Sequence, residues 1–254
     1  MSNVQSVERA LTLLNVISEY PDGIQIARLA EQVNLSKSTI HRLLSTLYNM
    51  NYVVKVPETD KYKLGYQVVY LSRNVLKSDS VKRIAQPYLE ELSSDVNETI
   101  HLCIEDIGEV LYIDKIESNQ TIRMFSRVGN RAPMYCTGVG KILLSGLQSE
   151  EFDEVIRNTD FIAKTAKTII TKETLIEEVE KVTLQGYALD NIENEEGIRC
   201  IAAPIKDYQG NIIASFSISG PSNRITMERV HDELISKIKK TSLAISQQLG
   251  FTNI

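Results

Sequence analysis

The sequence has few cysteines and histidines. Its three cysteines, Cys103, Cys136 and Cys200, show no CxxC spacing, and no two of its three histidines stand at metal-ligand spacing. We therefore expect no disulfide framework, no zinc knuckle and no metal site carried by a motif. The chain also lacks a nucleophile elbow, a P-loop and a dinucleotide fingerprint. These absences argue against an enzyme and against a bound cofactor.

Long hydrophobic runs are absent too. Hydrophobic residues make up 43% of the chain, which is enough for a core. No apolar run approaches the roughly 20 residues that span a bilayer. Residues 1–9 are polar, carry both charge signs and lack the apolar region of a signal peptide. We expect a cytoplasmic protein without membrane contact.

A net charge of −5 is unusual for a DNA-binding protein, but the charge of this chain is unevenly distributed. Residues 1–63 hold seven basic and six acidic side chains, a net charge of +1, which leaves −6 for the rest. The acidity therefore belongs to the C-terminal part. It neither supports nor excludes a DNA-binding N-terminus.

Helical spacing of apolar residues predicts three helices near the N-terminus. The segments are 7–17, 26–33 and 37–50. Ser6 and Ser36 stand where N-caps are expected for the first and third of them. A β-branched and aromatic run at 52–56, turn residues at 57–60 and a second run at 61–64 predict a hairpin. Three helices followed by a small hairpin is the order of a winged helix-turn-helix.

The side of the third helix that faces away from its apolar stripe is polar and cationic, with no acidic residue. We expect it to contact DNA through Ser36, Lys37, Ser38, Thr39, His41, Arg42 and Ser45. Such groups suit the major groove, because they bond base edges and phosphates without like-charge repulsion. Lys55 and Lys61 on the hairpin are expected to reach flanking phosphates. The alternative is an ordinary solvated helix face, although such a face normally mixes both charge signs.

The remainder predicts two helical stretches and then an α+β domain. The stretches lie at 68–76 and 81–92, with a boundary near 78–80, and Pro87 predicts a kink or a late start of the second. Period-two patterns predict strands at 99–105, 109–116, 121–126, 187–191, 198–205 and 212–219. Helices are expected from 137, after 150, at 173–184 and from a cap at Thr226 to 249.

Seven segments, taken in order along the chain, resemble the IclR family of bacterial regulators. They are Val4–Leu11, Leu35–Leu44, Tyr62–Gly65, Cys136–Lys141, Gly186–Asp190, Glu196–Ile205 and Ser217–Pro221. Members usually carry glycine before the first wing strand, where this chain has Asn51. Asparagine is the usual substitute for a left-handed glycine, so we expect Asn51 to adopt that conformation.

The resemblance implies a fold and a function. It implies a winged helix-turn-helix at 1–65, a dimerising linker helix at 66–79 and an α+β effector-binding domain at 80–254. That domain is expected to hold an antiparallel sheet of the GAF/PAS-like kind. The resemblance also implies binding to operator DNA as a dimer or tetramer, controlled by a small organic, aromatic or sugar acid. A repressor of a catabolic operon is favoured over an activator.

Position by position, the resemblance also implies an effector site. Its residues are Thr121, Met124, Gly138, Val139, Asp190, Cys200, Ser217 and Ser219. The chemistry is consistent, since bare backbone amides at a helix start suit a carboxylate. Asp190 would accept from a ligand hydroxyl, which favours a polyhydroxy or carbonyl acid.

Each of these site residues also has a structural interpretation. Gly138 and Gly140 suit close packing of the helix on the sheet, and the two serines are ordinary small strand residues. Cys200 suits a buried position, although a nucleophile paired with a histidine and oriented by Asp190 is the enzymatic alternative. His101 is interpreted as a satisfied polar residue, with a place in the wall of the effector pocket as the less favoured alternative.

Overall fold

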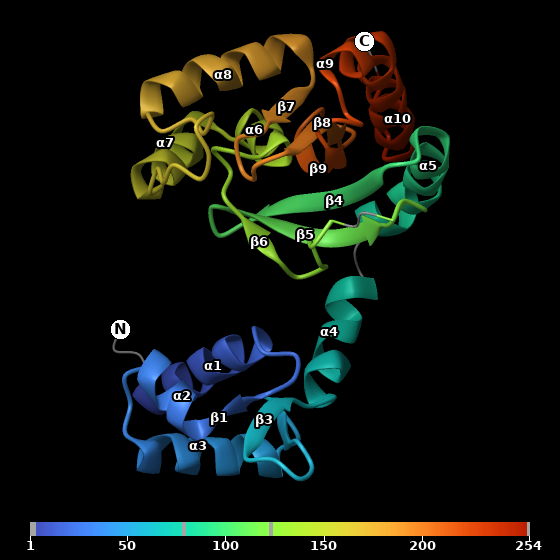
Figure 1. Ribbon diagram of the computed structural model, residues 1–254. Coiled ribbons are helices and arrows are strands. Elements are labelled where there is room, and N and C mark those ends of the chain that lie inside the picture. Colours follow the sequence, from blue (N-terminus) through green and yellow to red (C-terminus); the bar gives the residue numbers. More distant parts are fainter. Residues whose placement is uncertain (1–3, 78–79, 122–123, 253–254) are drawn as a thin grey trace. The chain divides into compact units, whose positions relative to one another are not determined.

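The structure is a computed structural model that describes residues 4–77, 80–121 and 124–252 (Figure 1). The chain divides into two compact units, Met1–Ser78 and Asp79–Ile254. Each unit has hydrophobic clusters of its own. Among the described residues, no helix combines the length and the apolar character needed to cross a bilayer.

The N-terminal unit contains the predicted three helices and hairpin. Its elements are α1 (Gln5–Ser18), β1 (Ile24–Gln25), α2 (Ile26–Gln32), α3 (Lys37–Asn49), β2 (Val53–Lys55), β3 (Lys61–Leu64) and α4 (Gln67–Lys77). The strands form an antiparallel sheet in the order β1-β3-β2. The apolar stripes of the helices meet in one core, formed by Leu13, Ile17, Ile24, Leu29, Ile40, Leu44, Leu47 and Val53.

Of the two predicted caps in this unit, one is confirmed and one is wrong. The Ser36 side chain accepts the Thr39 amide at 3.3 Å and begins α3. Ser6 lies inside α1, whose N-cap is Val4 without a side-chain bond. The Val4 carbonyl already accepts the amides of Val7 and Glu8, so the helix begins before Ser6.

The turn after α3 depends on an unusual backbone position. Asn51 has a φ of +61°, so the left-handed conformation expected of it is confirmed. Its carbonyl lies against Gly65, where an added Cβ would stand 2.2 Å from the Asn51 oxygen. Only glycine allows the chain leaving β3 to approach the turn this closely.

The C-terminal unit is built on one six-stranded antiparallel sheet, in the order β6-β5-β4-β9-β8-β7. The strands are β4 (Thr99–Asp106), β5 (Glu109–Ile116), β6 (Arg131–Ala132), β7 (Ala188–Asn191), β8 (Ile198–Lys206) and β9 (Ile212–Pro221). The long pairings β4 with β5, β4 with β9 and β8 with β9 form the centre of the sheet. The predicted α+β fold with an antiparallel sheet is confirmed.

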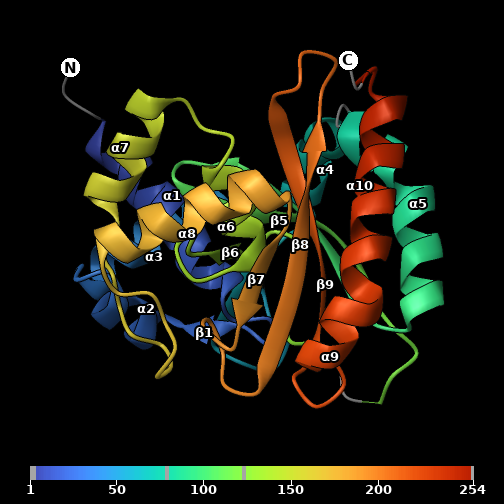
Figure 2. The same cartoon turned by 90° about the horizontal axis from the view of Figure 1, so that it is seen from above.

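Helices cover both faces of this sheet (Figure 2). On one face, α5 (Ser80–Val96) and α10 (Ile235–Gln248) pack on strand residues such as Ile100, Ile201 and Ile218. On the other lie α6 (Gly138–Leu144), α7 (Ser149–Asn158) and α8 (Lys172–Gln185). The sheet therefore separates two hydrophobic cores, one on each of its faces.

The predicted strand at 121–126 is wrong. Residues 121 and 124–126 form no strand, and 122–123 lie outside the described residues. The edge of β5 is paired instead with β6 and with Gly129 and Asn130, which bond the backbone of Tyr112. The Lys115 ammonium binds the carbonyls of Met124 and Ser126, at 2.8 and 2.9 Å, in place of a strand partner.

Of two further helix predictions, one is wrong and one is confirmed. Helix α5 begins at Ser80 and continues through Pro87, so a late start is wrong. Thr226 accepts the Arg229 amide at 3.1 Å and caps the final helical region, as predicted. That region runs through α9 (Met227–Arg229), a π-helix at Val230–Leu234 and α10.

Candidate functional site

The polar side of α3 is exposed, as expected for a helix that contacts DNA. Lys37, Ser38, His41, Arg42 and Ser45 are all exposed, and Thr39 is half-buried. The residues on the buried side, Ile40, Leu44 and Leu47, hold the helix on the core.

Hydroxyl groups cluster at the start of this helix. The Ser36 hydroxyl lies 3.0 Å from that of Ser38 and 2.9 Å from that of Thr39. On the hairpin, Lys55 is exposed and pairs with Asp60 at 3.3 Å, while Lys61 is half-buried. Exposed cations therefore occur both on α3, at Lys37 and Arg42, and on the hairpin, at Lys55 and Lys63.

A second candidate site lies in the C-terminal unit, on the sheet face covered by α6. Strand register places His101 opposite Ser217, and Ser219 opposite Cys200, which is itself opposite Asp190. Directly opposed residues share a face of a sheet. The side chains of four neighbouring strands, β4, β9, β8 and β7, therefore meet at one place.

These side chains line a cavity of about 210 Å³. All predicted effector residues except the exposed Thr121 belong to its walls, namely Met124, Gly138, Val139, Asp190, Cys200, Ser217 and Ser219. The walls also include His101, whose less favoured interpretation was a place in the pocket wall, and residues that the sequence did not single out, among them Tyr112, Arg131, Lys164 and Asn194.

His101 joins two sides of the cavity. Its Nδ1 lies 3.1 Å from the Ser219 hydroxyl and its Nε2 lies 2.6 Å from the Ser126 hydroxyl. Burial lowers the pKa of His101 to about 3, and the nearby Lys115 ammonium adds to the effect. The imidazole is therefore neutral at physiological pH. His101 is a satisfied polar residue, as interpreted, and is also part of the cavity wall.

The thiol and hydroxyl groups on the sheet side of the cavity, which forms its floor, are likewise uncharged. Burial raises the pKa of the Cys200 thiol well above its usual value, and the Asp190 carboxyl raises it further. A thiolate nucleophile is not favoured in such surroundings. The Ser217 and Ser219 hydroxyls lie 3.0 Å apart. The floor thus offers neutral hydrogen-bonding groups and no activated nucleophile.

Asp190 is the buried acid of the cavity. Burial raises its pKa to about 6. Its Oδ1 accepts the backbone amides of Glu193 and Asn194, at 2.7 and 3.3 Å, so this oxygen shapes the loop after β7. Arg199, on the strand beside it, points away from the cavity and donates to Asn191 and to the Ser222 and Ile225 carbonyls.

The two glycines at the start of α6 have different surroundings. A Cβ at Gly138 would stand 3.3 Å from the Asp190 amide nitrogen and from the Ala202 Cβ, at the cavity wall. A Cβ at Gly140 would stand 2.4 Å from both the Cα and the carbonyl oxygen of Met134. Gly140 is therefore required for close packing, whereas Gly138 borders the cavity.

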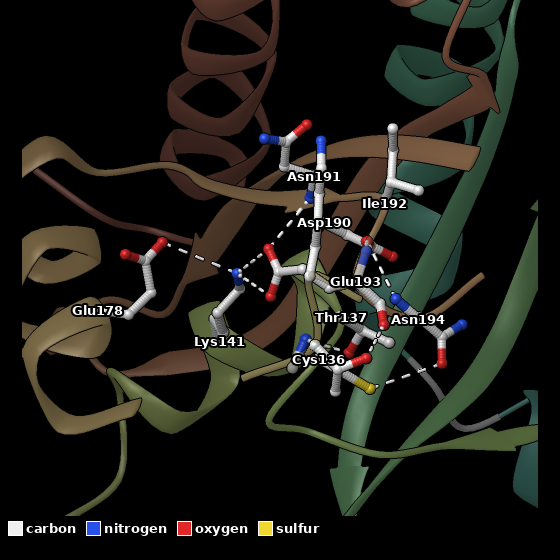
Figure 3. A network of polar contacts seen from close by, with 12 residues as sticks. Cys136, Thr137, Lys141, Glu178, Asp190, Asn191, Ile192, Glu193 and Asn194 are labelled. Carbon is white, nitrogen blue, oxygen red and sulfur yellow. Dashed lines mark hydrogen bonds and ion pairs between the residues drawn. The ribbon is translucent and has the colours of Figure 1, made fainter. Parts of the chain in front are cut away.

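A network of polar contacts connects α6 to the loop after β7 (Figure 3). The Lys141 ammonium lies 2.8 and 2.9 Å from the two Glu193 carboxylate oxygens and 3.7 Å from Glu178. Glu193 also accepts the Asn191 amide, and Asn194 accepts from the Cys136 thiol. These contacts fix the loop that supplies one wall of the cavity.

A larger hollow, of about 870 Å³, lies between α7 and the turn that joins β4 to β5. It contains none of the residues predicted from the sequence. Its acidic wall residues are Glu105, Glu109, Glu151, Glu154 and Asp160. Such a lining repels an anion, so the smaller cavity is the candidate effector site.

Comparison with known proteins finds matches to both units. The family described as "Bacterial transcriptional regulator IclR C-terminal" matches residues 73–247, and the "IclR helix-turn-helix domain" matches residues 6–57. The Escherichia coli regulator XynR is 34% identical over 251 residues, covering 99% of each chain. The E. coli regulator KdgR is 36% identical over 249 residues, covering 98% of this chain and 94% of that protein.

Solved structures give the same result. The crystal structure of the Thermotoga maritima IclR is 32% identical, has a TM-score of 0.77 and covers 98% of this chain and 100% of that one. The likeness extends over both units, each with its own candidate site. The chain therefore belongs to the IclR family of DNA-binding transcriptional regulators.

Proposed function

We propose that this regulator is a cytoplasmic repressor of a catabolic operon, and that a small acid in the 210 Å³ cavity controls its binding to operator DNA. The observation that carries the proposal is that an exposed, acid-free face on α3 and a polar cavity occur in one chain. Two relatives carry repressor names, the acetate operon repressor of Salmonella typhimurium and the transcriptional repressor IclR of E. coli, each 32% identical.

The chemistry of the cavity supports a small polyhydroxy or carbonyl acid. Ser217, Ser219 and neutral His101 offer hydroxyl and imidazole groups for bonds to ligand oxygens. Lys164 also belongs to the walls and favours a negative charge there, whereas the Arg131 guanidinium is already paired with Asp106 and Glu109. Asp190 suits a ligand hydroxyl.

Self-association is supported by apolar residues on two helices of the N-terminal unit. Val4, Val7 and Leu11 are 65%, 55% and 56% exposed at α1, and Val69 and Leu71 are 62% and 52% exposed on α4. Large exposed apolar side chains favour burial in an interface. We place the dimer contact here, in and near the linker segment 66–79.

Footprinting with the purified protein tests the proposal. We expect protection of a palindromic site in a neighbouring promoter, and loss of that protection when a sugar acid such as D-gluconate is added. A thermal-shift screen with sugar, keto and aromatic acids identifies the acid class, because a ligand that binds only the native state raises its apparent stability. The absence of any protected site in the neighbouring promoters would contradict the proposed repressor.

A further inference from the structure

The side chain of Lys141 is completely buried in α6, one turn after the glycine that borders the cavity. A buried ammonium group is costly unless a counter-charge and hydrogen bonds compensate for it. Glu193 supplies both, through two contacts of 2.8 and 2.9 Å, and Glu178 adds a more distant carboxylate at 3.7 Å. An apolar side chain would fill this position without that cost, so the packing of α6 alone does not account for a lysine.

Glu193 lies in the short loop between β7 and β8, and nearly every polar group of that residue is bonded. Its carboxylate also accepts the Asn191 amide at 3.1 Å, and its own amide donates to Asp190. Its carbonyl accepts the Thr168 hydroxyl at 2.7 Å. Figure 3 shows the Lys141 ammonium pointing toward the Glu193 carboxylate of this loop, with Glu178 on its other side.

The backbone of this loop is strained at Ile192, which has a φ of +66°. A β-branched residue rarely adopts the left-handed conformation. Such a conformation persists only where its surroundings enforce it, and strain of this kind gathers at functional sites. Both neighbours of Ile192 are held by side-chain bonds. The Asn191 amide donates to the Glu193 carboxylate. Glu193 in turn is bonded to Asp190 through its amide and to Lys141 through its carboxylate.

The loop and α6 both supply walls of the effector cavity. Asp190 and Asn194 come from the loop region, and Gly138 and Val139 come from α6. Lys141 and Glu193 themselves are not part of the walls. Their ion pair joins the two walls from behind.

We propose that Lys141 is a positioning residue, whose ion pair with Glu193 holds the strained loop against α6 and so sets the shape of the effector cavity. The inference rests on the proposed function, since it takes the cavity to be the effector site. It assigns to Lys141 an effect on the effector through Asp190 and Asn194, without contact between Lys141 and the ligand.

The test removes the pair without leaving a buried charge. In the double variant Lys141→Met, Glu193→Gln, the glutamine keeps an acceptor for the Asn191 amide. A matched control, Lys82→Met with Asp114→Asn, removes an ion pair of 2.9 Å that joins α5 to β5. If the double variant does not fold, Glu193→Gln alone serves, because Lys141 keeps Glu178 nearby.

Hydrogen exchange on the full-length proteins, without any ligand, gives the primary readout. We expect the Glu193 and Asn194 amides to exchange at least about tenfold faster in the double variant, which corresponds to about 1.4 kcal/mol of lost local protection. The control should leave these amides unchanged, and the central strand amides should remain protected in both. Unchanged exchange at Glu193 and Asn194, or equal acceleration throughout the domain, would overturn the inference.

Calorimetric titration with D-gluconate then separates this inference from the proposed function. We expect the double variant to bind the acid about tenfold more weakly and to keep the operator affinity of the unliganded wild type. A wild type that does not bind D-gluconate contradicts the proposed acid class, while the exchange result still decides the role of Lys141. Equal D-gluconate affinity in wild type and double variant would overturn the positioning role.

Discussion

An alanine at position 140 would place a methyl group where α6 packs against the chain before it. The added Cβ would stand 2.4 Å from the Cα and the carbonyl oxygen of Met134, and 2.6 Å from the Thr137 hydroxyl. Two of these obstacles are backbone atoms, which a change of rotamer does not move. At Gly138 the nearest atoms are 3.3 Å away, so small shifts accommodate the methyl group there.

The cost of Gly140→Ala follows from these distances. Overpacking a filled core destabilises by about 1–3 kcal/mol, and fixed backbone obstacles favour the upper end of that range. Alanine returns at most about 1 kcal/mol through its helix propensity. The net loss is about 2 kcal/mol. For a domain of this size, each kcal/mol lowers Tm by roughly 2–4 °C, so Tm should fall by about 4–8 °C.

Thermal unfolding followed by circular dichroism measures the effect, with Gly138→Ala as the matched variant. We expect Gly138→Ala to change Tm by no more than about 2 °C, since gained helix propensity offsets a small strain. It should weaken effector binding, because the methyl group occupies the cavity wall. If Gly140→Ala were as stable as Gly138→Ala, the packing argument for Gly140 would be refuted.

Three further predictions concern the two sites. Arg42→Ala should weaken operator binding by about 1–3 kcal/mol in a mobility-shift assay, because the exposed guanidinium is lost from the face of α3. The control is Arg157→Ala, which removes an exposed arginine from α7. Equal operator affinities of these two variants would contradict the placement of α3 in the groove. Replacing Ser217 and Ser219 together by alanine should shift the effector dose-response to higher concentration at unchanged operator affinity, and an unshifted curve would remove the two hydroxyls from the site. Asp190→Asn should stabilise the protein at pH 8, by up to about 3 kcal/mol, since the pKa of the buried carboxyl is raised from 3.8 to about 6. A raised acid pKa stabilises the folded state below pH 4 and loses that contribution as the pH rises through about 6, so the advantage of the variant should fade between pH 6 and pH 4. Urea unfolding at pH 8, 5 and 4 checks this, and an advantage that does not vary with pH would count against the cause given.

Local signals accounted for most of the N-terminal unit. The apolar stripe of α3 and its Ser36 cap were predicted from the sequence, because each depends on residues a few positions away. The left-handed conformation of Asn51 was expected from the glycine that other family members carry there. The errors there are small ones. Strand β1 has two residues, too few for a period, and the first cap fell on Ser6 instead of Val4.

In the C-terminal unit, alternation predicted most strands but not their partners. The run at 121–126 alternates as a strand does, yet the β5 edge that it would pair with is occupied by β6 and by the chain before it. The effector residues came from the family resemblance. The strand register then placed Asp190, Cys200 and the two serines in one cavity with His101, for which lining the pocket had been the less favoured interpretation.

The sequence by itself therefore determined most of the helices, the caps at Ser36 and Thr226, the family and the residue types of the site. Tertiary structure alone decided that His101 meets Ser219, which is 118 positions away, and that Lys141 meets Glu193, 52 positions away. It also decided which of the two α6 glycines is needed for packing. The physical reason is range: periodicity and capping act within about one helical turn, whereas strand pairing, burial and charge compensation depend on what the folded chain brings alongside.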